Sequence, residues 1–460
     1  MGRYQAYPEY KDSGVEWLGD IPADWSVSKL KHVASIHGRI GFRGYTVDDI
    51  VDEGEGAIVL SPSNIDGDTF DLNKKVYLSW FKYYESPEIM VNAGDILLVK
   101  TGSTYGKSAI IRALDEPMTI NPQMAILKNS KVDPRYLAYL MSSSLIKAKI
   151  DISNTGSGMP TMTQENINNF PIPHPKDNLD IHIANFLDHE TAKIDTLIEQ
   201  QQQLIQLLKE KRQAVISHAV TKGLNPDAPM KDSGVEWLGE VPAHWVICRL
   251  KHIKSVSQNA FVDGPFGSNL KSEHFIDNGD VYVIESNFAT TGEIDSSSLK
   301  TISNAHFETI KRSEATAGDI IIAKIGARFG MSSILPSLDK KSVVSGNSLK
   351  LTVNADVVTR MYAHKLLTVL KEMGAMDDGV NGSAQPALSL GELNNLLFLV
   401  PPIQEQSEIE SFIQLNQDKF DVLLEKANVQ VRLLQERRTA LISAAVTGKI
   451  DVRNWQAPQQ

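Results

Sequence analysis

The sequence of 460 residues has little of what marks a secreted or a membrane protein. It contains one cysteine, Cys248, so it can form neither an internal disulfide nor a cysteine-rich zinc site. Its apolar runs are short, such as residues 396–400, whereas a membrane-spanning helix needs roughly 20 residues. Residues 1–10 have no apolar core of the kind that a secretory signal carries. We therefore expect a cytoplasmic protein in a reducing compartment, without a membrane segment.

Basic residues are in the minority as well, because 46 Lys and Arg stand against 56 Asp and Glu, for a formal net charge of −10. On its own this charge argues against nucleic-acid binding, since phosphate contacts need Lys and Arg. Binding is local, however, while the net charge averages over the whole chain. The apolar fraction of 42% is that of an ordinary globular protein, and the length predicts about three domains.

What the chain does have is a tandem duplication. Residues 11–25 match residues 231–245 at 12 of 15 positions, and these two boxes hold four of the six tryptophans. Residues 207–221 match residues 433–447 at 10 of 15 positions. Weaker matches between these anchors keep the same order. The chain therefore consists of two homologous halves, each a variable globular region followed by a more uniform helix.

The pattern of apolar residues divides the chain further. Short β-rich runs, separated by Gly, Asn, Asp and Pro and interrupted by short helical patterns, predict α+β domains within residues 1–175 and 246–401. Residues 176–222 and 402–452 each contain a long stretch without Gly or Pro (178–221 and 404–447), which predicts two long helices. The remaining segments are a linker with the repeated box at 223–245 and a tail at 453–460.

Apolar positions recur every seven residues in both predicted long helices. A helix of about 40 residues spans roughly 60 Å, which is longer than one domain of this size could cover. We therefore favour two helices that pack on each other over the alternative, a surface helix on each domain. The main stripe consists of Leu187, Ile194, Gln201, Leu208 and Val215 in the first helix and of Ile413, Phe420, Ala427, Leu434 and Leu441 in the second.

Three stretches look like catalytic motifs but depart from them. Residues 101–108 differ from a phosphate loop because Gly102 comes one residue too late. Residues 121–124, Asn-Pro-Gln-Met, lack the second proline and the aromatic residue of the amino-methyltransferase motif. Asp95 and Lys100 could suggest a nuclease pair, but no second carboxylate is near Lys100, and a turn explains Asp95 better. We find no catalytic or metal-binding constellation and expect a non-catalytic chain.

Local basicity remains. Residues 26–47, 100–112 and 246–262 carry Lys and Arg without any acid, and residues 322–341 carry four basic residues against one Asp. Gly, Ser, Thr, Asn and aromatic residues stand between the charges, and these types suit phosphate contact and base-edge readout. Ordinary surface explains any one run equally well, but recurrence in both halves favours DNA binding. The candidate contact residues are Arg39, Arg43, Tyr45, Lys100, Ser103, Tyr105 and Lys107 in the first half, and Ser268, Asn269, Lys271, Lys324, Arg328 and Phe329 in the second.

In their order along the chain, these features resemble the specificity subunits of bacterial type I restriction–modification systems. The alternation of variable region and uniform helix covers essentially the whole chain. Residues 263–271, Asp-Gly-Pro-Phe-Gly-Ser-Asn-Leu-Lys, are similar to the opening motif of many target recognition domains, and the Gly-Asp-Ile runs at 94–97 and 318–321 resemble another motif. The first half has Gly-Arg-Ile-Gly-Phe-Arg-Gly-Tyr at 38–45 instead, which indicates that the two domains read different sequences.

The resemblance implies a non-catalytic, sequence-specific subunit that binds double-stranded DNA. Each recognition domain would bind one half of a bipartite, asymmetric target, and the long helices would form an antiparallel coiled coil as a spacer. Two methyltransferase subunits, which carry S-adenosylmethionine, would dock on it, and ATP- and Mg-dependent restriction subunits would complete the complex. The chain itself would bind no cofactor. Two alternatives are a methyltransferase or nuclease with a diverged active site and a protein–protein scaffold without a DNA role.

Overall fold

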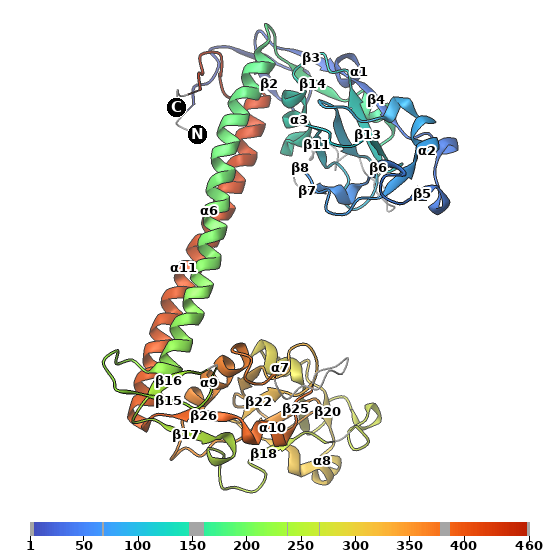
Figure 1. The fold of residues 1–460 in the computed structure, drawn as a ribbon. Coiled ribbons are helices and arrows are strands. Elements are labelled where there is room, and N and C mark those ends of the chain that lie inside the picture. Colours follow the sequence, from blue (N-terminus) through green and yellow to red (C-terminus); the bar gives the residue numbers. More distant parts are fainter. Residues whose placement is uncertain are drawn as a thin grey trace. The chain divides into compact units, whose positions relative to one another are not determined.

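The computed structural model describes residues 4–66, 69–146, 161–236, 238–265, 267–377 and 387–457. The chain forms two compact units: unit 1 consists of residues 1–203 and 428–460, and unit 2 of residues 204–427 (Figure 1). Each unit contains one globular head, one copy of the tryptophan box and one part of each long helix. We call residues 26–175 head 1 and residues 246–401 head 2.

Head 1 is built on two four-stranded sheets. The first is antiparallel, in the order β11-β10-β13-β4, and the second, in the order β12-β6-β9-β5, contains one parallel pair, β12 with β6. The strands are β4 (Ser35–Gly38), β5 (Ile50–Val51), β6 (Gly56–Leu60), β9 (Tyr77–Ser79), β10 (Ile96–Val99), β11 (Ser108–Ile110), β12 (Met118–Ile120) and β13 (Met124–Lys128).

Both faces of the first sheet in head 1 are buried. Ile96 and Leu98 of β10 face the core that includes α3 (Pro134–Ser142), while Leu97 and Val99 face the core shared with the second sheet. This is why β10 is a continuous apolar run instead of an alternating one. The smaller elements are α1 (Leu30–Val33), β7 (Ile65–Asp66), β8 (Thr69–Phe70), α2 (Trp80–Tyr84) and α5 (Gln164–Asn168), and β3 (Ser26–Lys29) pairs with β14 (Pro171–His174).

Head 2 repeats the first sheet and three strands of the second, while its fourth strand, β21, pairs with β24 and not with the strand equivalent to β9. Its first sheet has the order β18-β25-β22-β23 and its second β20-β19-β24-β21, and Ile320 pairs with Leu351 as Ile96 pairs with Leu127. The predicted α+β duplication is thereby confirmed. The strands are β17 (Val246–Arg249), β18 (Phe261–Asp263), β19 (Val281–Ile284), β20 (Thr301–Ile302), β21 (Glu314–Ala315), β22 (Ile320–Ala323), β23 (Ser332–Ile334), β24 (Lys341–Val344), β25 (Ser348–Leu351) and β26 (Leu397–Val400), and the helices are α7 (Ser286–Thr291), α8 (Asn304–Ile310), α9 (Arg360–Glu372) and α10 (Leu390–Asn395).

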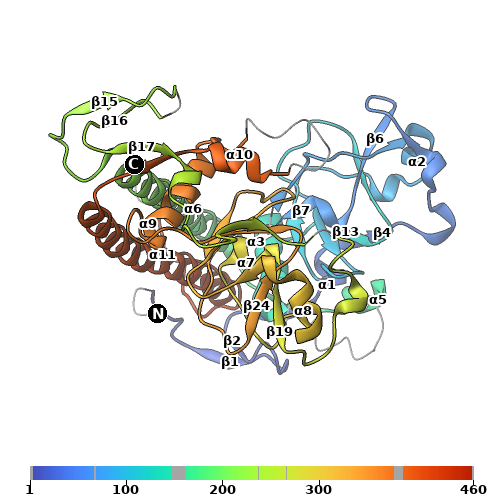
Figure 2. The ribbon, with the colours of Figure 1, turned by 90° about the horizontal axis from the view of Figure 1, so that it is seen from below.

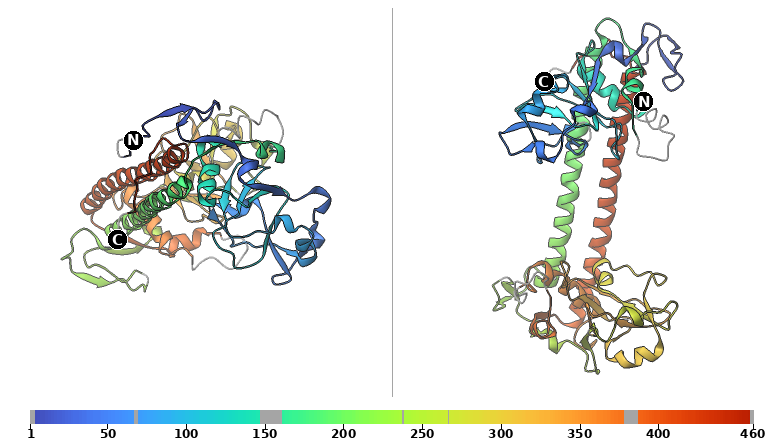
Figure 3. Two further views of the ribbon diagram at one scale, coloured as in Figure 1. Left: turned by 90° about the horizontal axis from the view of Figure 1, so that it is seen from above. Right: turned by 90° about the vertical axis from the view of Figure 1, so that its right-hand side faces the viewer.

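The two predicted long helices are present as α6 (Leu179–Lys222) and α11 (Ile403–Val446), with 44 residues each, and both bounds lie within one residue of the prediction. In unit 1 the first part of α6 and the last part of α11 run side by side in opposite directions (Figures 1 and 3), and Arg438 Nε donates to Asp195 Oδ1 at 2.7 Å. In unit 2 the corresponding Arg212 donates to Asp421 at 2.8 Å. None of the described helices has the length and apolar composition that a membrane span requires.

Within each unit the predicted heptad stripe lies on the sheltered side of the helices, although Leu208 and Val215 of α6 are only half-buried. Leu187 and Ile194 of α6 and Leu441 of α11 are buried in unit 1, and Ile413 and Phe420 of α11 are buried in unit 2. The helices therefore pack as an antiparallel coiled coil in each unit. The alternative of an isolated surface helix on each domain is wrong.

Each tryptophan box packs at the C-terminal end of a long helix. Box 1 is the hairpin of β1 (Tyr10–Asp12) and β2 (Asp20–Pro22), and Tyr10 Oη donates to Gly448 O, just beyond α11, at 3.0 Å. Box 2 is the hairpin of β15 (Met230–Asp232) and β16 (Glu240–Pro242), which Figure 2 shows well away from β19 and β24 of head 2. The indole rings that follow the hairpins, Trp25 and Trp245, are fully buried.

Candidate nucleic-acid interface

Several chain segments leave from one edge of the first sheet in each head. In head 1, β4 and β10 end at this edge and β11 and β13 begin there, because neighbouring strands are antiparallel. The corresponding edge of head 2 lies at the ends of β18 and β22 and the starts of β23 and β25. We call these the loop edges. All thirteen predicted contact residues lie on segments that leave from these edges, but their side chains do not all face the same way.

The loops between β10 and β11 and between β22 and β23 have the same backbone shape. Each contains two glycines four residues apart with positive φ, a conformation that costs glycine little because it has no Cβ. They are Gly102 (110°), Gly106 (80°), Gly326 (98°) and Gly330 (81°). Both loops join two antiparallel strands, whereas a phosphate loop leads from a strand into a helix. Residues 101–108 therefore resemble a phosphate loop in sequence but not in structure.

The aromatic residues of these loops face inward. Phe329 is buried in the core of head 2, and Lys371 Nζ lies 3.5 Å from its ring centroid. Tyr105, at the corresponding place in head 1, is partly buried and packs against the main core. The structure thus places both rings as anchors of the loop, whereas the sequence predicted them as contact residues.

Arg39 also differs from the expectation. Its side chain is buried, with Nε donating to Ile120 O and Nη2 to Thr119 Oγ1, both at 3.1 Å. Burial lowers the pKa of this guanidinium, and the Tyr45 ring lies 5.3 Å from its Cζ. Arg39 therefore braces the segment after β4 against β12 instead of lying on the surface, and Tyr45 packs against this brace. Arg43, four residues on, forms an ion pair with Glu88 at 3.3 Å and stays partly exposed.

Lys100 and Lys324 occupy equivalent places but differ in their partners. The backbone N–H of each donates at 2.9 Å to the residue before β13 or β25. The ammonium of Lys324 forms an ion pair with Asp263 at 3.2 Å, and Arg312 pairs with the same carboxylate at 3.2 Å. No carboxylate in the described part of the chain pairs with Lys100, and burial lowers the pKa of its ammonium.

The other candidates lie at or near the surface. Arg328 and Ser103 are exposed on the two loops, and Lys107 is partly exposed at the end of the first. Ser268, Asn269 and Lys271 are exposed on the segment after β18, although Phe266 of the same motif lies outside the described residues. His306 Nε2 of α8 lies 2.9 Å from Asn269 O, and Lys271 Nζ lies 3.7 Å from Glu273. These contacts hold the segment in place while its side chains stay exposed.

The sequence prediction missed an amide at each loop edge. Gln123 and Asn347 are exposed, and their carbonyls are the acceptors for the N–H groups of Lys100 and Lys324. Asn and Gln side chains can read adenine through two hydrogen bonds. The signal was their common spacing from the two lysines, but residues 121–124 were considered only as a methyltransferase motif.

The nuclease-like pair is not a pair in the structure. Asp95 precedes β10 and Lys100 follows it, so the strand separates them. Asp95 accepts a hydrogen bond from Asn92 N at 2.8 Å, as a turn residue does, and forms an ion pair with Lys128 at 3.1 Å. The turn interpretation of Asp95 is confirmed.

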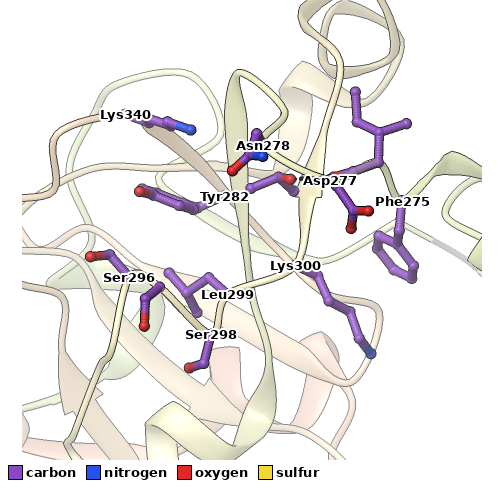
Figure 4. Close-up of a pocket in the computed structure, with 12 residues that line it drawn as sticks. Phe275, Asp277, Asn278, Tyr282, Ser296, Ser298, Leu299, Lys300 and Lys340 are labelled. Carbon is purple, nitrogen blue, oxygen red and sulfur yellow. Dashed lines mark hydrogen bonds between the residues drawn. The ribbon is translucent and has the colours of Figure 1, made fainter.

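A polar hollow of about 710 Å³ in head 2 lies apart from the loop edge (Figure 4). It is found at the start of β24, whereas the loop edge is at the end of that strand. Lys340 donates to Gly279 O at 2.9 Å and also lies over the Tyr282 ring, and the Tyr282 hydroxyl donates to Asp339. Since these groups are engaged with one another, we do not include the hollow in the candidate interface.

The chain thus has two homologous heads, and each head has a loop edge of basic, hydroxyl and amide side chains. This arrangement, together with the two long helices, is typical of a duplicated DNA-binding protein. The chain belongs to the family whose profile is described as "Type I restriction modification DNA specificity domain", which matches residues 22–207 and 266–430. Membership makes it a DNA-specificity component of a type I restriction–modification system and not a catalytic one. Nothing found supports the alternative of an enzyme with a diverged site.

Individual relatives agree with this assignment. The chain is 23% identical over 382 residues to the type I restriction enzyme MjaVIII specificity subunit of Methanocaldococcus jannaschii, covering 82% of this chain and 84% of the relative. A solved structure described under complex assembly and conformational transition of the type I R-M system matches with a TM-score of 0.64 at 16% identity, covering 93% and 98%. The HsdS subunit of Thermoanaerobacter tengcongensis matches with a TM-score of 0.53 at 14% identity, covering 94% and 98%. At these identities the solved structures support the fold alone.

Proposed function

We propose that head 1 and head 2 each read one half of a bipartite, asymmetric double-stranded DNA target through their loop edges. The observation that carries the proposal is the equivalence of the two edges in backbone and their difference in side chains. The contacting groups would be Arg43, Lys100, Ser103, Lys107 and Gln123 in head 1, and Ser268, Asn269, Lys271, Arg328 and Asn347 in head 2. Each well-made pair of hydrogen bonds to a base would discriminate by about 1–3 kcal/mol, so a few per head give a specific site.

We further propose that the coiled coil acts as a spacer that sets the number of base pairs between the two half-sites. Its support is the uninterrupted 44-residue length of α6 and of α11. Deleting one heptad from each helix, residues 194–200 and 420–426, keeps the stripe in phase and removes about 10 Å of helix, which corresponds to about three base pairs. We expect a shorter gap in the modified motif or no modification, and an unchanged gap would exclude the spacer.

The same helices would hold the partner subunits. Two leucines of α6 recur in α11 at the spacing of the duplication and remain exposed in both copies, which favours two equivalent docking places and hence two methyltransferase subunits. They are Leu197 (45% exposed) with Leu423 (46%), and Leu207 (61%) with Leu433 (47%). Restriction subunits would join this complex. The S-adenosylmethionine, ATP and Mg²⁺ of the reactions would be bound by the partners, and none by this chain.

The experiment that tests the reading function is sequencing of methylated bases in the host with and without the gene for this chain. A bipartite motif that disappears with the gene supports the proposal, and a methylation pattern that does not depend on the gene contradicts it. The scaffold alternative makes a separate prediction, because Arg43→Ala, Lys100→Ala and Arg328→Ala would then leave the affinity of the assembled complex for DNA unchanged.

A further inference from the structure

The structural equivalence of the heads pairs Gly38 with Asp263. In head 1, Gly38 at the end of β4 is the partner of Ala125 in β13. In head 2, Asp263 at the end of β18 is the partner of Leu349, which occupies the place of Ala125. The two heads therefore differ at one position directly beside the lysine of the loop edge: one has a carboxylate there and the other has no side chain.

In head 2 this carboxylate neutralises the lysine. Asp263 accepts from Lys324 Nζ and from Arg312 Nη2, both at 3.2 Å, and the side chains of Asp263 and Lys324 are only 13% and 19% exposed. Such a shielded pair fixes the ammonium in place. To contact DNA, Lys324 would have to break its ion pair with Asp263.

In head 1 the equivalent lysine, Lys100, has no such partner among the described residues. A Cβ added to Gly38 would lie 3.2 Å from Lys100 Nζ, so the ammonium occupies the space that a carboxylate on this residue would reach. It makes no ion pair or hydrogen bond with the described residues, and burial, which lowers its pKa, is the one cause resolved for the shift. A half-buried cation without a partner is unfavourable, and an acceptor that arrives with a ligand removes the penalty.

The loops themselves differ in where they carry charge. Arg328 is exposed in the loop of head 2, whereas the corresponding residue of head 1 is Thr104. The loop of head 1 instead ends on the partly exposed Lys107, at the place of Met331 in head 2. Head 1 thus has a lysine beside Gly38 that pairs with no described residue, and head 2 has a neutralised lysine and an exposed arginine on its loop.

We propose that the two heads contact DNA through different cations: Lys100 beside Gly38 in head 1, and Arg328 on the loop in head 2, with Lys324 held by Asp263 as a structural residue. The group that Lys100 takes is a hydrogen-bond acceptor of DNA, either a phosphate oxygen or the O6/N7 edge of guanine. This inference rests on the proposed function and assigns the contacts within it.

The first test compares equivalent lysines. The full chain is assembled with its methyltransferase partner, and its affinity is measured against salt concentration on a duplex that carries the methylated motif of the host and on a scrambled duplex. Lys100→Met should weaken binding of the motif duplex about tenfold. Lys324→Met should change the affinity less than about twofold while lowering the melting temperature, because it leaves Asp263 with one partner fewer. Arg328→Met should match Lys100→Met in size.

The second test transplants the difference. Gly38→Asp should place a carboxylate beside Lys100 and weaken DNA binding as much as Lys100→Met does, whereas Gly38→Asn, which has the same shape without the charge, should have a clearly smaller effect. Combining Gly38→Asp with Lys100→Met leaves the new carboxylate without its cation, so the double variant should bind DNA more weakly than either single variant, whereas Gly38→Asn should add little to Lys100→Met.

The outcomes separate the possibilities. A loss equal on both duplexes, with the slope of log affinity against log salt reduced by about one, identifies a phosphate contact. A loss confined to the motif duplex, with altered preference at one base pair, identifies a guanine contact. Unchanged affinity in Lys100→Met with an unchanged melting temperature overturns the inference, as does an equal loss in Lys324→Met. Failure of the proposed function itself would appear differently, since the wild-type complex would not distinguish the two duplexes.

Discussion

Head 1 and head 2 show which parts of the duplicated fold are free to differ. The first sheet, three strands of the second sheet, the positive-φ glycines of the loop and the lysine after the strand recur at the same places. The side chains around that lysine do not, since Gly38 stands for Asp263 and Thr104 for Arg328. Buried strands and tight turns are kept in both heads, and exchanges at the loop edge alter its charge without disturbing the core.

A second contrast lies inside the heads. Tyr136 of α3 and Tyr362 of α9 are fully buried, and their hydroxyls donate to carbonyls of Pro173 and Val220 respectively. Two residues further on, head 1 has Ala138 and head 2 has His364. The two heads therefore pack in the same way here, but only head 2 has a titratable side chain at this position. A change of pH should for this reason affect the two heads differently.

The largest expected effect tests the equivalence of the two tryptophan boxes. Trp25→Ala and Trp245→Ala each remove a fully buried indole and should each cost about 3–5 kcal/mol of unfolding free energy. The losses should be local, in unit 1 for Trp25 and in unit 2 for Trp245, as measured by hydrogen exchange of β10 and β22. Trp80→Ala, at a tryptophan that is 36% exposed, is the control and should cost under about 1 kcal/mol. A loss from Trp25→Ala that spreads equally to unit 2 would contradict the local assignment.

The next prediction breaks the difference at the loop edge. Asp263→Asn frees Lys324 and Arg312 from their shared carboxylate, so the assembled complex should bind a scrambled duplex more tightly, by about tenfold at low salt, with a steeper salt dependence. Fluorescence anisotropy across a salt series measures both quantities. Asp280→Asn, at an exposed carboxylate near the start of β19, serves as the matched control. An unchanged salt slope in Asp263→Asn would mean that the two cations do not reach DNA even when they are free.

The sequence alone predicted the duplication, the bounds of both long helices and the presence of basic loops in each half, but not that these loops leave from one edge of a sheet. These features rest on signals that are local or periodic: a heptad spacing, the absence of Gly and Pro, and glycines at fixed offsets. The direction of each side chain was not predictable in the same way. Arg39 and Phe329 are residue types that often contact DNA, yet Arg39 is hydrogen-bonded to β12 and Phe329 is packed into the core of head 2. Partners far away in the sequence decide which side chains are buried.

The partners of the two lysines were equally hidden. Gly38 and Asp263 lie in motifs that do not resemble each other in sequence, and only the pairing of β4 with β13 and of β18 with β25 shows that they are equivalent. Gln123 and Asn347 keep the same spacing from the lysines in the sequence, but what places each beside its lysine is a backbone hydrogen bond between segments more than twenty residues apart.

A pH experiment should separate the two heads. Burial first, and the charge of Lys365 second, lower the pKa of His364 from 6.5 to about 4, and its Nδ1 lies 3.1 Å from Ser332 Oγ. The folded head favours the neutral ring, so protonation favours unfolding, and the stability of head 2 should fall as the pH drops from 6.5 towards 4. At pH 5 the loss should be about 1–2 kcal/mol.

Hydrogen exchange of β22 and β10 at pH 7 and pH 5 follows head 2 and head 1 separately. His364→Ala gives head 2 the residue of head 1 at this place and should remove the extra pH dependence of β22, even though it lowers stability at pH 7. If β10 loses protection as much as β22 between these pH values, His364 is not the cause.

The smallest expected effect concerns the two ion pairs of the coiled coil, Arg438 with Asp195 in unit 1 and Arg212 with Asp421 in unit 2. Exposed pairs of this kind contribute about 0.2–1 kcal/mol, and Arg212→Gln and Arg438→Gln should have equal effects within that range because the pairs are related by the duplication. Double-mutant cycles with Asp421→Asn and Asp195→Asn isolate each coupling energy from other effects of the substitutions. Both couplings should shrink in 1 M salt. Two clearly unequal couplings would show that the helix pair is less symmetric than its sequence, and the difference between the heads would then extend into the coiled coil that they share.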